Sequence, residues 1–139
     1  MDISIFEDDL CKKSDGVIVY IDKLGIRTTK KTDFWIKVAA IDGNQRYFDK
    51  KDEWIVAHAE DPENPTAEDI ERAHSYAMAH AILVDWSITQ DGESVNYSPE
   101  AAHTYLANPA MKRFANLVWA ESMRVSNFSV SKLEKEKKH

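Results

Sequence analysis

Four prolines constrain the fold of this 139-residue chain more than any other feature, because all of them lie between residues 62 and 109. Proline disfavours helical backbone at the residue before it, so Pro62 and Pro65 must end any helix that precedes them. Pro99 instead follows Ser98, a typical helix cap, and proline suits the first helical position. The second half of the chain is therefore predicted to consist of helices with sharply defined starts.

Helical periodicity fills the segments between these breaks. A short helix is predicted over residues 49–60 and the longest over 66–86, where Thr66 is the N-cap and Asp69 completes a capping box. Further helices are predicted to begin at Ser98 and at the pair Asn108-Pro109. Apolar residues at steps of three and four mark the faces expected to be buried: Ile70, Ala73, Ala77 and Ala81 in the longest helix, and Met111, Phe114, Ala115, Val118, Ser122 and Val125 in the last.

The first third of the chain is rich in β-formers. Residues 17–21 are β-branched or aromatic and follow the turn pair Asp15-Gly16, which predicts a strand. Residues 34–41 alternate as a second strand, and Asp42-Gly43 predicts a hairpin whose return strand is 46–48. Residues 26–32 are expected to form an edge strand or a loop. The predicted fold is α+β, with a small N-terminal antiparallel β unit followed by a mainly helical body of about four helices.

A chain of this length is expected to form one domain. We predict a flexible acidic arm over residues 1–15, a single α+β domain over 16–128, and a charged C-terminal tail over 129–139. The arm carries five acidic residues and two lysines, a net charge of −3, and the tail carries four lysines and two glutamates, a net charge of +2.

Composition excludes several classes of protein. The net charge of −6 argues against broad nucleic-acid binding, and no apolar run approaches the roughly 18 residues of a membrane span. Residues 1–15 lack the pattern of a secretion signal. The single cysteine, Cys11, cannot form an internal disulfide, which fits a reducing cytoplasm.

No catalytic constellation is recognisable in the sequence. The histidines lack zinc-ligand spacing, and Cys11 has no fixed base nearby. The four glycines are isolated at turns, so no phosphate-binding loop is present. The expectation is a protein with no enzymatic activity, no metal and no cofactor.

One stretch, residues 83–101, resembles the tail assembly chaperones of long-tailed phages and prophages. In that family an aliphatic pair precedes an acid or glycine and a tryptophan, a polar Asp-Gly loop follows, and an aromatic residue with Ser/Thr-Pro-Glu opens the next helix. The residues that carry the resemblance are Leu83, Val84, Asp85, Trp86, Asp91, Gly92, Val95, Tyr97, Ser98, Pro99 and Glu100. Each of these residues also has a structural role, in the core, in a turn or at a helix cap. They therefore form a fold signature and not a catalytic motif.

The resemblance implies a non-enzymatic assembly factor in the host bacterial cytoplasm that is absent from the mature virion. Such a protein binds the long helical tape-measure protein, helps recruit tail-tube subunits, and can self-associate. If the helices form a groove, the expected partner-binding residues are Tyr76, His80, Trp119 and Met123.

Two alternatives stay open at this point. A structural minor tail or tube-associated virion protein would share the same fold signals. A small host regulatory or toxin-neutralising protein is suggested only by the acidic residues Glu7, Asp8 and Asp9.

Overall fold

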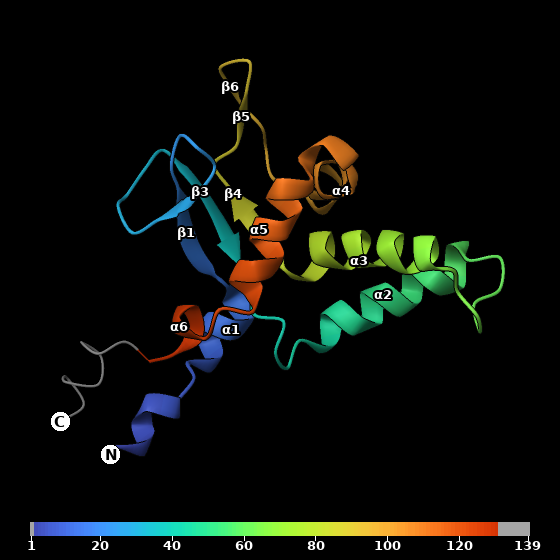
Figure 1. Cartoon of the computed structure of the whole chain (residues 1–139), viewed down its shortest axis with the longest axis horizontal. Coiled ribbons are helices and arrows are strands. Elements are labelled where there is room, and N and C mark those ends of the chain that lie inside the picture. The colour runs from blue at the N-terminus through green and yellow to red at the C-terminus, as the bar shows by residue number, and fades with distance from the viewer. Residues whose placement is uncertain (1, 131–139) are drawn as a thin grey trace.

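The computed structural model describes residues 2–130. It is an α+β fold in which an antiparallel sheet is followed by a mainly helical remainder, as the sequence predicts (Figure 1). The elements, in chain order, are η1 (Ile3–Phe6), α1 (Leu10–Asp15), β1 (Val17–Ile21), β2 (Arg27–Thr28), β3 (Phe34–Val38), α2 (Gln45–His58), α3 (Ala67–Ala81), β4 (Leu83–Trp86), β5 (Thr89–Gln90), β6 (Glu93–Ser94), α4 (Pro99–Ala107), η2 (Pro109–Met111), α5 (Lys112–Ser122) and α6 (Val125–Phe128).

The main sheet has the strand order β2-β1-β3-β4, with every neighbouring pair antiparallel. The predicted strand over 17–21 is present, and the basic 26–32 segment supplies the edge strand β2. Val19 pairs with Ile36, and Ile36 pairs in turn with Trp86. These side chains are buried on the face of the sheet that the helices cover, and they join α3, α4 and α5 in one core.

Gly16 is the point at which α1 turns into the sheet. Its φ of +91° is unfavourable for residues with a side chain, and an added Cβ would lie 2.8 Å from Cγ2 of Val84. The sequence-predicted turn before β1 therefore requires glycine both for its backbone conformation and for its close approach to β4.

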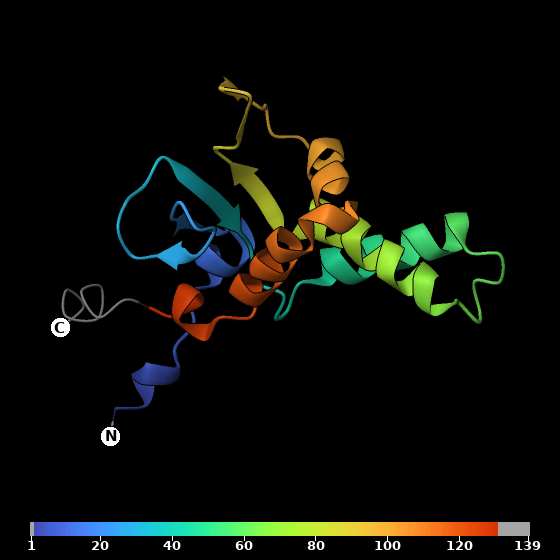
Figure 2. The ribbon, with the colours of Figure 1, turned by 45° about the horizontal axis from the view of Figure 1, so that its top comes forward.

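The starts of α3 and α4 follow the predicted signals, whereas Asn108-Pro109 opens the short 3-10 helix η2 and α5 begins at Lys112. Thr66 Oγ1 accepts the N–H of Asp69 at 3.1 Å, and the Asp69 carboxylate accepts the N–H of Thr66 at 3.0 Å, which completes the capping box. Ser98 caps α4, and Pro99 is its first residue. Helices α2 and α3 lie side by side as a hairpin that projects away from the sheet (Figure 2). The buried alanines of α3, Ala73 and Ala77 among them, allow this close packing.

Several sequence predictions are wrong, and one of them is the expected burial of Ile70, which is 42% exposed on α3. Residues 46–48 do not return as a strand, because Asn44 Oδ1 accepts the N–H of Tyr47 at 3.0 Å and starts α2 four residues earlier than the predicted helix. The longest helix ends at Ala81, and Leu83–Trp86 forms β4, because these residues gain a partner strand in β3. The last long helix ends at Ser122, so Val125 begins α6 and is exposed.

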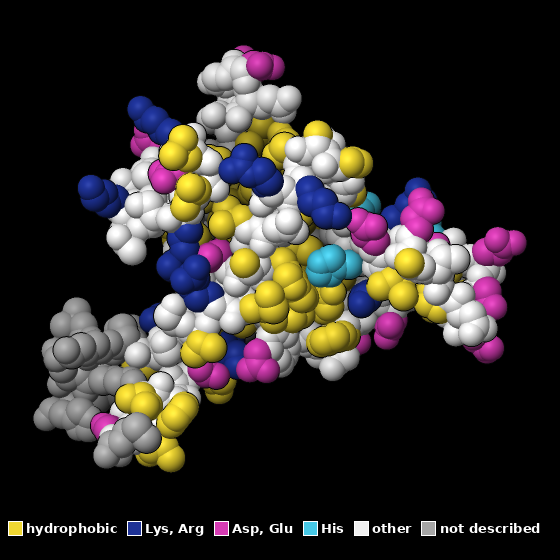
Figure 3. All heavy atoms as spheres, viewed as in Figure 1, with side chains coloured by type: hydrophobic (Ala, Val, Ile, Leu, Met, Phe, Trp, Pro, Cys, Tyr) yellow, Lys and Arg dark blue, Asp and Glu magenta, His cyan; other side chains and the backbone are white. Residues whose placement is uncertain are grey.

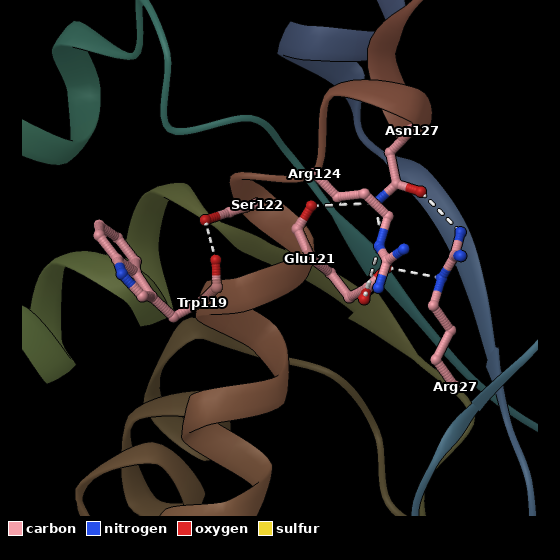
Figure 4. A network of polar contacts seen from close by, with 6 residues as sticks. All are labelled: Arg27, Trp119, Glu121, Ser122, Arg124 and Asn127. Atoms are coloured by element: carbon pink, nitrogen blue, oxygen red, sulfur yellow. Dashed lines mark hydrogen bonds and ion pairs between the residues drawn. The ribbon is translucent and has the colours of Figure 1, made fainter.

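A buried polar network ties the edge strand β2 to α5 and α6 (Figure 4). Glu121 is only 1% exposed. Its carboxylate lies 2.7 Å from Nε of Arg27, poorly aligned for a hydrogen bond, and 3.2 Å from Nε of Arg124. Asn127 donates to the Glu121 side chain and accepts from Nη2 of Arg27, so three residues surround the buried charge.

The N-terminal segment lies beside the end of α6. The N–H of Asp9 donates to the carbonyl of Phe128 at 2.7 Å, and the N–H of Val130 donates to the carbonyl of Glu7 at 3.1 Å. Residues 1–15 thus contain η1 and α1. The predicted charged tail falls mostly on residues 131–139, which lie outside the described part of the chain.

Candidate functional site

A surface groove of about 540 Å³ lies between α3, α4 and α5. We call it the helical groove. Its apolar floor contains the buried side chains of Met78 and Leu106 and the half-buried Ala115 and Trp119. Its rim is polar and of both signs, since α3 contributes Glu68, Glu71 and Arg72, and the start of α5 contributes Lys112 and Asn116. The Lys112 ammonium lies 3.5 Å from the Glu71 carboxylate.

Trp119 joins the groove to an aromatic cluster at the base of the α2–α3 hairpin. The ring of Trp119 packs edge-on against His74 at 4.6 Å and lies 5.6 Å from Tyr47, while Phe48 packs edge-on against Tyr47 at 5.1 Å. Figure 3 shows apolar side chains gathered at the centre of this face, over α5 and the adjoining parts of α2 and α3. The floor of the groove therefore continues into an aromatic cluster in which Tyr47 is buried, His74 and Trp119 are half-buried and Phe48 is exposed.

Burial shifts the pKa values of two residues in this cluster. Desolvation lowers the pKa of His74, with a further lowering from Lys51 and an opposing contribution from Glu71. Burial raises the pKa of the Tyr47 hydroxyl. The two groups are 2.6 Å apart, and a neutral His74 with its proton on Nε2 accepts the Tyr47 hydroxyl at Nδ1. At neutral pH the cluster is thus uncharged and lies beside a charged rim.

The structure brings together only some of the predicted partner-binding residues. Trp119 lines the helical groove. Tyr76 and His80 pack against each other at 4.3 Å, and Tyr76 also meets His103, on a side of α3 where its hydroxyl donates to Glu53. Met123 is exposed and lines a separate hollow beside α6.

Sequence reasoning missed His74, Tyr47 and Met78 as parts of this surface. The sequence pattern predicts a strand at Tyr47, and the position of Tyr47 next to Trp119 depends on how α2 packs against α5. The spacing of His74, four residues after Ile70 and three before Ala77, places it beside the predicted stripe and is the signal that could have found it. Met78 itself is buried and belongs to no predicted stripe.

The larger cleft, about 670 Å³, lies beside the start of α2, but its polar groups already have partners within the fold. Lys13 pairs with Asp42 at 2.6 Å, Arg46 donates to the carbonyl of His80 at 2.7 Å, and Asn44 donates to the carbonyl of Ala81 at 2.9 Å. These contacts anchor the loop before α2, so the helical groove is the better candidate for binding.

The residues of the fold signature within 83–101 stabilise the fold and do not line the helical groove. Trp86 donates its indole N–H to the carbonyl of Val95 at 2.7 Å and packs edge-on against Tyr97, whose hydroxyl donates to the carbonyl of Leu83 at 2.6 Å. Asp91 and Gly92 both have positive φ and form the turn of the β5–β6 hairpin.

Neither a metal site nor a membrane span is found in the described part of the chain. Residues 2–130 contain no group of three or more His, Cys, Asp or Glu side chains placed to hold a metal ion. No helix in this range has the length and apolar character needed to cross a membrane.

The sequence profile of the YdaY prophage protein family matches residues 38–139, a span that contains every element of the helical groove. The chain belongs to the YdaY prophage protein family. Membership in this family confirms the phage or prophage origin that the resemblance implied. No curated protein and no solved structure matches the chain.

Proposed function

We propose that this member of the YdaY family is a non-enzymatic tail assembly chaperone that holds helical segments of the tape-measure protein in the helical groove and helps recruit tail-tube subunits. The observation that carries the proposal is the groove itself, with its apolar floor and its rim of both charges. The resemblance of residues 83–101 to tail assembly chaperones supplies the choice of partner.

The groove fits the chemistry of an amphipathic helix. Such a helix would lay its apolar face on the half-buried Ala115 and Trp119, above the buried Met78 and Leu106, the mode in which helices dock into hydrophobic grooves. The exposed ion pair between Glu71 and Lys112 spans the rim at 3.5 Å, so it would open on docking and release both charges to pair with the flanks of the helix. A long helical partner with many such segments would engage many copies, so each contact can stay weak and reversible.

The test is binding of purified full-length protein to helical tape-measure segments from the same prophage, followed by fluorescence anisotropy. Asn116→Arg places a bulky cation in the groove and is expected to weaken binding at least tenfold. Ala120→Arg is the matched control, because Ala120 is an exposed residue of the same helix that does not line the groove. Equal binding by both variants, or no binding by the unmodified protein, would reject the groove as the site.

A second measurement separates a chaperone from a structural tail protein. Quantitative mass spectrometry of purified virions is expected to find tail-tube and tape-measure proteins but not this chain. Recovery of the chain in fixed proportion to the tail tube would favour a minor tail or tube-associated protein.

A further inference from the structure

The N-terminal segment presents several large apolar side chains to solvent. Ile3, Ile5, Phe6 and Leu10 are all exposed, with Phe6 at 71%, although the main chain of this segment is tied to the body through Glu7 and Asp9. We call residues 2–10 the apolar arm. Contiguous exposed apolar residues of this kind mark interaction sites in soluble proteins. Residues 1–15 also carry a net charge of −3, so a surface that receives the arm should be apolar and basic.

The same chain carries a surface of that complementary character. A hollow of about 250 Å³ lies between the end of β1, the start of β3 and the start of α5. We call it the β–α5 hollow, and its lining includes Ile21, Phe34, Met111, Arg113, Phe114 and Leu117. Arg113 is the only charged residue among the described residues that line it. In another protein, an apolar cavity of about 150 Å³ holds a benzene ring, so this hollow is large enough for an aromatic side chain.

The surroundings of the hollow extend both its apolar and its basic character. Leu24 and Ile26, on the loop after β1, are exposed apolar residues next to Gly25, which lines the hollow. Lys23, Lys30 and Lys31 lie on the loops that lead to and from β2, and because Asp22 and Asp33 are the only acids in residues 22–33, this segment keeps a net charge of +2. Opposite charges at the rims of two surfaces steer their encounter and fix their orientation.

We propose that the apolar arm of one copy docks into the β–α5 hollow of a second copy. The arm cannot reach the hollow of its own chain while the N–H of Asp9 donates to the carbonyl of Phe128. In this arrangement η1 lies beyond one end of the sheet and the loop after β1 lies at the other end (Figure 1). Two copies that exchange arms form a closed two-fold dimer, and copies that each give their arm to a different neighbour join head to tail into a ring or a short chain. This assembly needs no tape-measure protein and is independent of the proposed function.

The expected association is weak, since an arm of this length buries less than a standard protein interface. Sedimentation equilibrium of the full-length chain over roughly a hundredfold range of concentration should show an average mass that rises above the 15.9 kDa monomer. Ile3→Asp with Phe6→Asp in the arm, or Leu24→Glu with Ala110→Glu at the hollow, should each leave the protein monomeric. Val56→Glu is the matched control, because Val56 is a 71% exposed apolar residue on α2, outside both surfaces.

Mixing the two monomeric variants gives the decisive result. The hollow variant retains a normal arm and the arm variant retains a normal hollow, so an equimolar mixture should form dimers that cannot grow further. Circular dichroism melts of each variant establish that both are folded. A monomeric wild-type protein, a hollow variant that still assembles, or a mixture that stays monomeric would overturn the proposal.

Discussion

The buried Glu121 carboxylate has partners on β2, on α6 and in the turn between α5 and α6. Arg27 lies on β2, Arg124 lies between α5 and α6, and Asn127 lies on α6. Removing the carboxylate would leave the Arg27 guanidinium beside a cavity, and breaking a buried pair costs more than the pair contributes on formation. The network therefore fixes where the C-terminal elements sit against the sheet.

We expect Glu121→Ala to lower the free energy of unfolding by about 3 kcal/mol, at the low end for a broken buried pair because both arginines reach solvent. Arg124→Ala removes a largely exposed partner and should cost no more than about 1 kcal/mol. Urea denaturation followed by tryptophan fluorescence measures both values. Equal losses for the two variants would mean that the buried carboxylate is not the centre of the network.

Histidine burial predicts a loss of stability in mild acid. Desolvation is the largest cause of the lowered pKa of His74, and the pKa values of His80 and His103 are lowered in the same way. Below the ordinary histidine pKa of about 6.5 the unfolded chain binds more protons than the folded one, so stability falls as the pH decreases from there toward the folded-state values. His74→Phe should reduce this slope in chemical denaturation between pH 7 and pH 5, and an unchanged slope would exclude His74 as a contributor.

At the scale of elements, the starts of α3 and α4 were predictable, and the start of α2 and the strand partners were not. Thr66, Asp69, Ser98 and Pro99 encode their roles within four residues of sequence, so local chemistry suffices. Leu83–Trp86 is as apolar as the helix before it, and only its pairing with β3 makes it a strand. The helical groove was equally hidden, because its walls come from three helices whose packing depends on long-range contacts.

The capping box at the start of α3 should make a measurable contribution to stability. Thr66→Ala removes the side-chain acceptor of the Asp69 N–H and is expected to lower the free energy of unfolding by about 1 kcal/mol. Thr104→Ala is the matched control, since that exposed hydroxyl bonds only within α4, to the carbonyl of Glu100, and its loss should change stability by less than about 0.5 kcal/mol. Thermal melts of both variants test the difference, and an equal effect would show that the cap is not needed to start α3.

At the scale of the whole molecule, the two halves of the sequence do not fold into separate layers. Strand β3, from the first half, pairs on one side with β1 and on the other with β4, which follows α3. Helix α2 packs along α3 across the loop that contains Pro62 and Pro65. The sequence suggested a β unit followed by a helical body, whereas the core is shared by residues from both parts.

This shared core predicts that neither half folds alone. A chain cut between Pro62 and Glu63 divides an exposed loop, so the two fragments, when co-expressed, should associate and recover the native circular dichroism spectrum. Expressed separately, the first fragment lacks β4 and α3 and leaves Ile36, Val38 and Tyr47 exposed, while the second loses the partner strand of β4. Each should then show no cooperative thermal transition. A second fragment that unfolds cooperatively on its own would instead make the helical part, with its groove, an independent unit.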